Sequence, residues 1–432
     1  MFRATFPLAR QRLRPYYPTD HRSDRRLAMT AQAPLIILYL PQEWDDYVRN
    51  PHWSAVGKLA PVLLVEPPAP LLIGGDRSAR WRSRRSHGAR PRQVDEGIFA
   101  FRPVSYLSFG VAARMPWLGR VDAGRIGNQV QAAIDQLEVE FDRTVSVVVK
   151  AQQFATAEVS PTDLTVYEVT DDYRVFPDQS VVNQDDPRSR RHLELERRLM
   201  AHTDLVVVCS EALRESRAAE HDQVVYLPNA ADIDHFAAGR DKATRIPDDL
   251  RILPSPRVGY VGGINELVDI DLLDQMADRH PEWSMVMIGQ LRGGSAFKTS
   301  SQLQRLHDRN NVYFLGHQPY EYLPGYLKGL DICLLPFVIN PWMQASSPNK
   351  TIQYLAAGKP VVSTDFPEAR RVDNVVRVAT DHGQFISQCE AALGDGSDDV
   401  IARRLAVAAE NSTGRRAERL VALIREAVSQ KR

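Results

Sequence analysis

Short continuous apolar runs recur along this chain, and polar or amphipathic segments of helical length separate them. The run 34–40 (PLIILYL) is a typical example. Apolar runs of this length are typical of strands that are buried on both faces of a parallel sheet. Strands that alternate with helices therefore predict an α/β fold with helices on both faces of the sheet. The predicted strands of this first series are 34–40, 62–65, 144–149, 164–169, 205–210 and 224–229.

The same pattern restarts after a polar segment, 237–256, which contains three prolines and is interpreted as a linker. The chain has 432 residues, too many for a single core. We therefore expect two Rossmann-like domains with parallel sheets, at 31–240 and 255–400. Ligands of such sheets bind at the carboxyl ends of the strands, and here two sets of ends can face a central cleft. The predicted strands of the second series are 257–261, 285–289, 312–316, 331–336 and 360–363.

The segment 345–363 (ASSPNKTIQYLAAGKPVVS) predicts a helix that begins at an anion and runs into a buried strand. Ser347 can cap the helix, and Pro348 suits its first turn. Gly358 stands where a left-handed residue ends a helix. Free N–H groups at a helix start attract anions, and Lys350 adds a full positive charge one turn in, with Gln353 on the same face. This helix end suits the diphosphate of a sugar nucleotide.

Paired glycines, Gly262 and Gly263, follow a predicted strand and precede a helix. Glycines let the backbone approach a pyrophosphate closely, although the pair alone is also typical of a tight turn. The three spaced glycines of a dinucleotide site are not present, which disfavours a dehydrogenase. Gln290 and His317 follow two more strands of the same sheet, so we expect both near the same crevice. The alternative for His317 is an ordinary surface histidine.

The charges are unevenly spread, although the formal net charge is zero. Residues 1–150 carry an excess of about eight positive charges, and residues 151–250 an excess of about nine negative ones. The basic stretch from Arg77 to Arg125 predicts either a surface for anionic lipid or an anionic acceptor, or a solvated loop. No nucleic-acid recognition motif accompanies the charge, so nucleic acid is not an expected partner.

The ends and cysteines of the chain give weaker signals. Residues 1–30 are basic and lack the apolar core of a secretory signal, so we expect a disordered leader, or translation that starts at Met29. No apolar run approaches the ~18 residues that span a bilayer. Cys209, Cys333 and Cys389 lack metal-ligand spacing and are expected to be buried, reduced thiols of a cytoplasmic protein.

The segment from Ser347 to Ser363 resembles the donor-site signature of two-domain glycosyltransferases of the GT-B fold, in families 1 and 4, and among them the teichuronic-acid-type enzymes of cell-surface polysaccharides. The resemblance implies that Lys350 contacts the donor diphosphate and that a closing helix, about 405–430, packs back on the first domain. It also implies catalysis without a metal or other cofactor. Most retaining members carry glutamates where this chain has Gln353 and Ala345. The donor-binding residues expected here are Gly262, Gly263, Gln290, His317, Ser346, Ser347, Asn349, Lys350 and Gln353.

The strand end Tyr167-Glu168-Val169-Thr170-Asp171 resembles the corresponding segment of xanthan-type glucuronosyltransferases, which are inverting enzymes. The resemblance implies that Asp171 is the general base, with Asp172 as the second candidate. A carboxylate there can take the proton of an acceptor hydroxyl during attack on the anomeric carbon. The alternative for Asp171 is a helix cap or a supporting hydrogen-bond partner. Asp45 and His52 are expected to contact the acceptor or else to lie on the surface.

The sequence therefore favours a cytoplasmic glycosyltransferase, peripheral at the inner membrane face. It would move a sugar, most simply from a UDP-sugar, to a polysaccharide or lipid-linked saccharide, with inversion slightly favoured. The alternatives are a nucleotide-sugar 2-epimerase of the same fold and a non-catalytic relative that binds nucleotide sugars. An epimerase needs a cluster of carboxylates and histidines in the cleft, which the sequence does not assemble.

Overall fold

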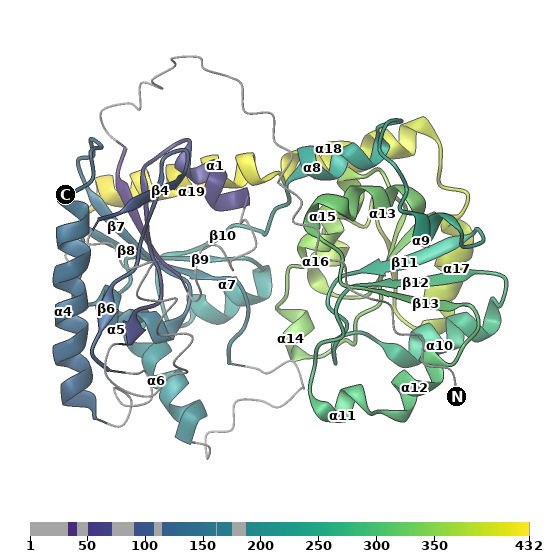
Figure 1. Ribbon diagram of the computed structural model, residues 1–432, viewed down its shortest axis with the longest axis horizontal. Coiled ribbons are helices and arrows are strands. Elements are labelled where there is room, and N and C mark those ends of the chain that lie inside the picture. Colours follow the sequence, from purple (N-terminus) through teal and green to yellow (C-terminus); the bar gives the residue numbers. More distant parts are fainter. Residues whose placement is uncertain are drawn as a thin grey trace, which may run out of the picture.

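Eight strands of the N-terminal half form one sheet in the computed structural model, which describes residues 33–40, 51–70, 90–107, 115–160, 162–174 and 187–431 (Figure 1). The strands lie in the order β10-β9-β8-β7-β1-β2-β5-β4, and every neighbouring pair is parallel except β4 and β5. The central strands are almost entirely buried apolar residues, as the sequence predicts. The strands are β1 (Leu35–Tyr39), β2 (Val62–Val65), β4 (Arg92–Asp95), β5 (Ile98–Phe101), β7 (Thr144–Val148), β8 (Leu164–Val169), β9 (Leu205–Val208) and β10 (Val224–Tyr226).

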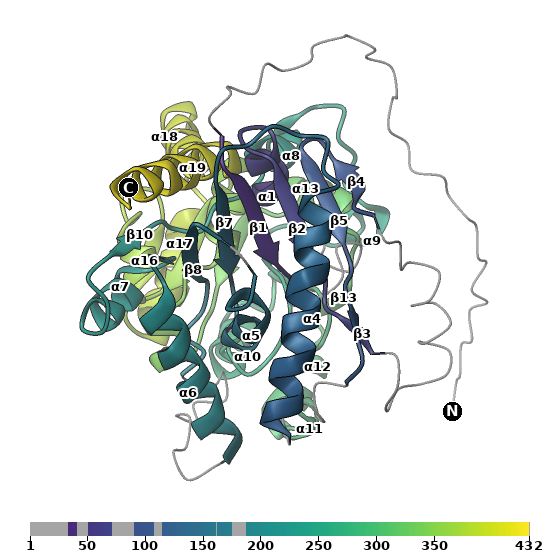
Figure 2. The same cartoon turned by 90° about the vertical axis from the view of Figure 1, so that its left-hand side faces the viewer.

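Helices cover both faces of this first sheet. One face packs against α1 (Pro51–Gly57) and the last helix of the chain, α19 (Thr413–Gln430). The other face packs against α4 (Pro116–Ile134), α5 (Phe154–Ala157), α6 (Pro187–His202) and α7 (Glu211–Ala218). Figure 2 shows α4 standing across the sheet and α19 on the other side of it. A small pair of strands, β3 (Ala69–Pro70) and β6 (Val104–Ser105), lies outside the main sheet.

Six parallel strands of the C-terminal half form the second sheet, in the order β13-β12-β11-β14-β15-β16. Numbered along the chain, this is the order 3-2-1-4-5-6 of a Rossmann-like sheet, so the strand order reverses between β11 and β14. Ligands bind in the crevice at such a reversal, because the connections leave the two strands in opposite directions. The strands are β11 (Arg257–Val261), β12 (Ser284–Ile288), β13 (Val312–Gly316), β14 (Ile332–Leu335), β15 (Val361–Thr364) and β16 (Arg377–Ala379).

The helices of the second half surround this sheet and share one hydrophobic core with it. Two of the longer helices carry side-chain caps, Asp269 before α10 and Asp381 before α17, which accept hydrogen bonds from the first turn. The helices are α8 (Ile233–Ala237), α9 (Asp248–Arg251), α10 (Ile270–Arg279), α11 (Ser295–Lys298), α12 (Ser301–His307), α13 (Leu323–Gly329), α14 (Pro341–Gln344), α15 (Asn349–Ala356), α16 (Pro367–Arg370), α17 (His382–Ala392) and α18 (Asp398–Glu410).

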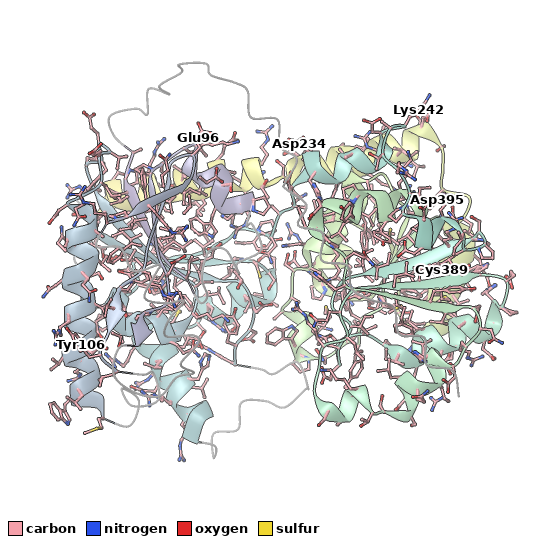
Figure 3. The ribbon with its side chains drawn as sticks, viewed as in Figure 1. Glu96, Tyr106, Asp234, Lys242, Cys389 and Asp395 are labelled. Atoms are coloured by element: carbon pink, nitrogen blue, oxygen red, sulfur yellow. The ribbon has the colours of Figure 1, made fainter. Side chains whose placement is uncertain are left out.

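The chain passes between the two lobes twice, and the two passages are bonded to each other. Ala231 N–H donates to Asn411 O (3.2 Å), and Thr413 N–H donates to Ala231 O (3.0 Å). Asp234, labelled in Figure 3, marks α8 where the first passage enters the second lobe. The second passage leads from α18, which packs on α15, to α19, which packs on the first lobe. Both passages therefore touch the helix that the sequence assigns to the diphosphate.

Several sequence predictions need correction. The segment 237–256, interpreted as a linker, contains the end of α8, a 3-10 turn (Ala238–Arg240) and α9. The predicted closing helix 405–430 is two helices that meet at Asn411 and Ser412. The basic stretch contains β4 to β6 and the start of α4 rather than only a loop, although Arg80 to Arg85 lie outside the described residues. Short amphipathic edge strands such as β16 lack the continuous apolar run that reveals the central ones.

The packing of α19 should contribute substantially to the stability of the first lobe. Leu420 is completely buried between α19 and the sheet, so Leu420→Ala removes buried methyl groups and leaves a cavity. We expect the free energy of unfolding to fall by about 2–5 kcal/mol in urea denaturation. Arg425→Ala, on the exposed face of the same helix, is the control and should change it by less than about 0.5 kcal/mol. Equal effects of the two substitutions would contradict this packing.

Candidate functional site

Lys350 lies against the backbone of the paired glycines at the end of β11. A Cβ atom built on Gly262 would lie 2.0 Å from Lys350 Cε and 2.8 Å from its Nζ. Gly262 also has φ +154°, a conformation that residues with a side chain rarely adopt. The glycine is therefore required both by its backbone conformation and by the lysine beside it. This pairing places the ammonium group at the strand-order reversal between β11 and β14.

Tyr354 explains why the lysine reaches this position. Its buried hydroxyl accepts a hydrogen bond from Val261 N–H (2.9 Å) and donates to Val261 O (3.2 Å), which ties α15 to the end of β11. Lys350 precedes Tyr354 by four residues, so both side chains lie on the same face of α15. The Lys350 ammonium also lies 5.6 Å from the centre of the Tyr260 ring. The helix thus presents its cation to the glycine loop in a fixed orientation.

Arg292 is a second cation at this loop, and the sequence analysis did not identify it. Its Cδ lies 3.3 Å from where a Cβ of Gly263 would be, and its backbone N–H donates to Ile264 O (2.8 Å). Burial, together with the positive charge of Arg292, lowers the pKa of Lys350 to about 8. Among the described residues, no carboxylate opposes these two effects. The glycine loop therefore has two cations beside it, an arrangement that suits a phosphate group.

The loop before α15 differs in detail from the sequence prediction. The capping position is Pro348, without a side-chain cap, and α15 starts at Asn349, so the predicted cap by Ser347 is wrong. Ser347 instead offers its carbonyl to Asn229 (3.0 Å), and the buried Ser346 hydroxyl donates to Trp342 O (2.8 Å). Gly358 does end the helix in the left-handed conformation, with φ +72°. These contacts order the loop without using the free N–H groups of the first turn.

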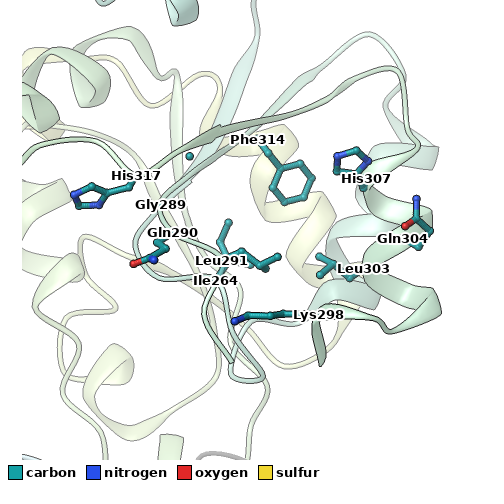
Figure 4. Close-up of a pocket in the computed structure, with 11 residues that line it drawn as sticks. Ile264, Gly289, Gln290, Leu291, Lys298, Leu303, Gln304, His307, Phe314 and His317 are labelled. Carbon is teal, nitrogen blue, oxygen red and sulfur yellow. The ribbon is translucent and has the colours of Figure 1, made fainter. Parts of the chain in front are cut away.

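Gln290 and His317 line a cavity of about 360 Å³ beside the glycine loop. Figure 4 shows these two side chains on one side of the cavity and His307 and Gln304 on the other. Ile264 N–H donates to Gln290 O (3.0 Å), so the cavity is directly joined to the loop that carries Gly262 and Gly263. Phe314 and Leu303 supply apolar walls. The cavity thus lies next to the glycine loop, shares Ile264 with it, and has both apolar and polar walls.

Asp171 follows β8 at the carboxyl edge of the first sheet. Burial raises the pKa of its carboxyl to about 6, while the charge of Lys150 opposes this shift and that of Asp172 adds to it. A carboxylate with a pKa near neutrality is a better proton acceptor than an ordinary aspartate and is still ionised at neutral pH. These properties are compatible with the role of general base that the resemblance implies for Asp171, which stays a prediction.

Asp172 has a different environment from its neighbour. Its carboxylate accepts a hydrogen bond from Arg217 (2.9 Å), which is completely buried on α7 and also donates to Glu196 (3.1 Å). Arg174 extends the network, because it donates to Glu196 (2.7 Å) and pairs with Glu220. This network anchors the loop that carries Asp171. Asp172 thus differs from Asp171 in that a buried arginine already pairs with its carboxylate, while its role as second candidate base stays a prediction.

Direct contacts join the two lobes beside these residues. Ser210, which follows β9, donates its buried hydroxyl to Ala345 O (2.7 Å). The Tyr173 ring meets the Trp342 ring edge to face at 6.5 Å. Further from this point, Glu368 accepts hydrogen bonds from Tyr226 (2.8 Å) and from the backbone of Glu211 (3.2 Å). The loop before α15 is therefore held directly against the edge of the sheet that carries Asp171.

Asp45 and His52 are the two residues expected to contact an acceptor. Asp45 lies outside the described residues. His52 is only 7% exposed, and its ring meets the guanidinium of Arg416, which also pairs with Glu168 (2.6 Å) and donates to Pro228 O (3.0 Å). This correction has a physical reason, because α19 covers α1 and buries the histidine. His52 belongs to the attachment of α19.

Within the described ranges, no group of three or more His, Cys, Asp or Glu side chains could hold a metal ion. Asp269 and Asp271 do not form a pair of ligands, since Asp269 caps α10 and Asp271 pairs with Arg305. The same part of the chain contains no helix long and apolar enough to cross a bilayer. The three cysteines are buried and unpaired.

The second lobe matches a known protein family. The model of the family "Glycosyl transferases group 1" matches residues 255–395, which include the glycine loop, Arg292 and α15. Residues 255–395 are a group 1 glycosyl transferase domain. A curated relative from Bacillus subtilis (strain 168), named as the teichuronic acid biosynthesis glycosyltransferase TuaH, is 27% identical over 212 residues. That match covers 47% of this chain and 52% of the relative, so the chain spans about half the length of this curated protein.

Solved structures extend the comparison to the first lobe. The UDP-forming α,α-trehalose-phosphate synthase from Burkholderia vietnamiensis superimposes with a TM-score of 0.64 over 92% of this chain and 100% of that one, at 14% identity. HepE from Anabaena, solved in complex with UDP, superimposes with a TM-score of 0.56 over 90% of this chain and 99% of that one, at 13% identity. The two lobes of the described structure therefore have the GT-B fold, and the match to the group 1 model lies in the second lobe.

The raised pKa of Asp171 should make wild-type protein less stable above pH 6. The folded carboxyl binds a proton more tightly than the unfolded one, whose pKa is about 3.9, so stability falls as pH rises between those two values. Asp171→Asn removes this loss. We expect the variant to be more stable than wild type by about 1–3 kcal/mol at pH 7.5, with the difference shrinking towards pH 5. Urea denaturation at several pH values measures it.

Asp163→Asn is the control of opposite sign. Burial opposes the shift, but hydrogen bonds from Thr144 and the contact with Arg143 lower the pKa of the Asp163 carboxyl. The stability that this carboxylate contributes is present at neutral pH and is lost on acidification, so its substitution should destabilise at pH 7.5. An Asp171→Asn variant that is destabilised at pH 7.5, or whose effect does not change with pH, would contradict the buried environment of Asp171.

Proposed function

We propose that the protein is a glycosyltransferase that moves a sugar from a nucleotide donor to a saccharide acceptor. The observation that carries this proposal is the pair of cations, Lys350 and Arg292, set against the Gly262-Gly263 backbone at the strand-order reversal. Such a site matches the diphosphate of a nucleotide sugar in both charge and shape. Asp171 lies across the junction of the two lobes and supplies the carboxylate that the transfer requires.

The donor is proposed to be a UDP-sugar. One solved structure of this fold is named as UDP-forming and another contains UDP. The cavity that Gln290 and His317 line adjoins the glycine loop, and its apolar and polar walls suit a nucleobase. The acceptor is proposed to be a polysaccharide or a lipid-linked saccharide of the cell surface, which the name of the teichuronic acid relative supports.

The proposed transfer forms one bond at the anomeric carbon of the donor sugar and breaks another. The acceptor hydroxyl oxygen attacks the anomeric carbon of the donor sugar, and its proton passes to Asp171. The bond between the anomeric carbon and the β-phosphate oxygen breaks, and the electron pair leaves with the nucleoside diphosphate. Lys350, Arg292 and the amides of the glycine loop stabilise the negative charge that develops on this leaving group. The proposal includes no metal ion or other cofactor, since two fixed cations are already directed at the diphosphate.

We further propose that the transfer inverts the anomeric configuration. Retaining members of the resembled families carry glutamates at the positions of Gln353 and Ala345. Here Ala345 is 6% exposed and packs into the hydrophobic cluster of the first lobe, so no carboxylate can act from that position. Direct displacement with one base needs only Asp171, whose carboxyl has a suitable pKa.

The alternatives receive less support from the site. An epimerase would need several carboxylates and histidines around the donor sugar, whereas the described side chains nearest Gly262 and Gly263 are Lys350, Tyr260 and Arg292. None of the proteins compared above is an epimerase. A non-catalytic binding protein would have no use for a carboxyl with a raised pKa opposite the diphosphate site. The cellular location proposed for the enzyme is the cytoplasm, peripheral to the inner membrane face through the Arg77 to Arg125 region.

The donor site is tested by thermal stabilisation with UDP. A ligand that binds only the folded state raises the melting temperature, and the rise follows its affinity. Lys350→Met removes one charge-assisted contact, so we expect the dissociation constant for UDP to increase about 10- to 100-fold. Lys242→Met, at an exposed position of the same lobe, is the matched control and should bind UDP like wild type. If neither UDP nor UDP-sugars raise the melting temperature of wild type or of Lys242→Met, the proposed donor site is wrong.

The proposed roles of Asp171 and Lys350 predict a bell-shaped pH dependence of kcat/KM for the donor. The rate should rise through about pH 6 as the Asp171 carboxyl ionises, and fall above about pH 8 as the free Lys350 ammonium loses its proton. Asp171→Asn should lower kcat by at least about 100-fold while UDP still binds. Transfer by this variant at the wild-type rate would exclude Asp171 as the base.

The stereochemistry is measured on the same reaction. Proton NMR of the first product, recorded before it can equilibrate, should show the anomeric configuration opposite to that of the donor. A product with the configuration of the donor would contradict direct displacement, whatever the pH profile shows.

A further inference from the structure

Lys150 is a cation at the carboxyl edge of the first sheet that the proposed reaction does not use. It follows β7, whereas Asp171 follows the neighbouring strand β8, so the two residues leave the sheet side by side. The charge of Lys150 acts on the carboxyl of Asp171 and on the ring of His192. Its ammonium lies 5.4 Å from the centre of the Tyr173 ring. Lys150 thus belongs to the immediate surroundings of the proposed base.

The ammonium of Lys150 has no salt bridge with any carboxylate of the described residues. The acidic groups near it are already engaged, since Asp172 pairs with Arg217 and Glu196 pairs with both Arg174 and Arg217. Its attraction to Asp171 is electrostatic, without a hydrogen bond between the two side chains in this part of the structure. The cation next to the base therefore has capacity for an anion from outside the protein.

Two buried polar atoms near Lys150 have no hydrogen-bond partner within the described structure. They are Nε2 of His192 and Nε2 of Gln153. The other ring nitrogen of His192 is engaged with Gln152 (2.9 Å), and the carbonyl of Gln153 accepts from the backbone of Lys150 (3.0 Å). Buried polar atoms are normally satisfied, so unpartnered ones beside a free cation point to a missing ligand.

Aromatic rings complete this region. The Tyr173 ring lies 6.4 Å from the His192 ring and 6.5 Å from the Trp342 ring, edge to face in both cases. Trp342 comes from α14 of the second lobe, so the region lies where the two lobes meet. Flat apolar rings next to hydrogen-bonding groups are suited to sugar rings, which have apolar faces and polar edges.

We propose that Lys150 binds an anionic group of the acceptor, a carboxylate or a phosphate ester, beside the hydroxyl that receives the sugar. This inference rests on the proposed glycosyltransferase function and names the chemical class of its acceptor. With the anion at Lys150 and the acceptor sugar against Tyr173 and Trp342, a neighbouring hydroxyl lies within the surroundings of Asp171. Neutral saccharides would lack the contact that fixes this orientation.

Binding of an acceptor anion by Lys150 can be distinguished from a role in which Lys150 only adjusts the pKa of Asp171. Lys150 lowers the pKa of Asp171 in the free protein, and an acceptor anion would neutralise part of that effect. If Lys150 served only to keep Asp171 ionised, its removal would shift the acid limb of the pH profile equally for every acceptor. An anion-binding lysine instead discriminates between charged and neutral acceptors.

The test is a ligand-observed NMR titration of the full chain with UDP present. The probes are methyl β-D-glucuronide, glucose 6-phosphate and neutral methyl β-D-glucoside. We expect at least one charged probe to bind wild type about tenfold more tightly than the neutral one, which is the effect of one charge-assisted contact. The two charged probes distinguish a carboxylate from a phosphate. Lys150→Met should remove the preference, and Lys150→Arg should retain most of it.

Two controls separate failure of the proposed anion site from failure of the proposed donor site. Lys58→Met changes an exposed lysine of the same lobe that precedes β2, at the opposite edge of the sheet, and should leave the preference unchanged. UDP binding is measured separately, so its loss would reject the proposed donor site rather than the anionic acceptor. Equal affinity of wild type for charged and neutral probes, including no detectable binding of any, would overturn the proposal. A preference that survives in Lys150→Met would also overturn it.

Discussion

The site depends on one pair of hydrogen bonds, those between the Tyr354 hydroxyl and the backbone of Val261. They join α15 to the end of β11 and so hold Lys350 against Gly262. Because these bonds are buried, losing them would leave the amide and carbonyl of Val261 without partners as well as releasing the helix. The cation site is therefore built into the core of the second lobe. It exists before any ligand arrives, which suits stabilisation of a charged leaving group.

The relation between the two lobes rests on a second set of buried contacts. Arg416 of α19 joins Glu168 of β8, His52 of α1 and the carbonyl of Pro228, while the two chain passages bond to each other at Ala231. Removing one partner of such a buried ion pair lowers the stability of the fold, because the other charge stays buried without a partner. These contacts fix the position of the carboxyl ends of the first sheet's strands relative to α15. The separation of Asp171 from the diphosphate site is thus a property of the crossing segments.

Much of this arrangement could be predicted from the sequence, and the failures have physical causes. The central strands and the position of Lys350 follow from continuous apolar runs and from helix signals that are local in the chain. Arg292 was missed because nothing near it in sequence marks it, and only the fold brings it to Gly263. His52 was misassigned because α19, more than 300 residues later, buries it. Asp172 resembles its neighbour in sequence, and its role depends on Arg217 from a distant helix.

The central claim is that Lys350 receives the donor diphosphate, and protection from chemical modification tests it most directly. Because burial lowers the pKa of Lys350 to about 8, its amine should react with a trace of acetic anhydride at pH 8 more readily than an ordinary lysine. Mass spectrometry of the peptides then compares the labelling of Lys350 with and without UDP, with Lys242 as the internal reference. The account predicts that UDP suppresses labelling of Lys350 and leaves Lys242 unchanged. Equal labelling of Lys350 with and without saturating UDP would contradict it.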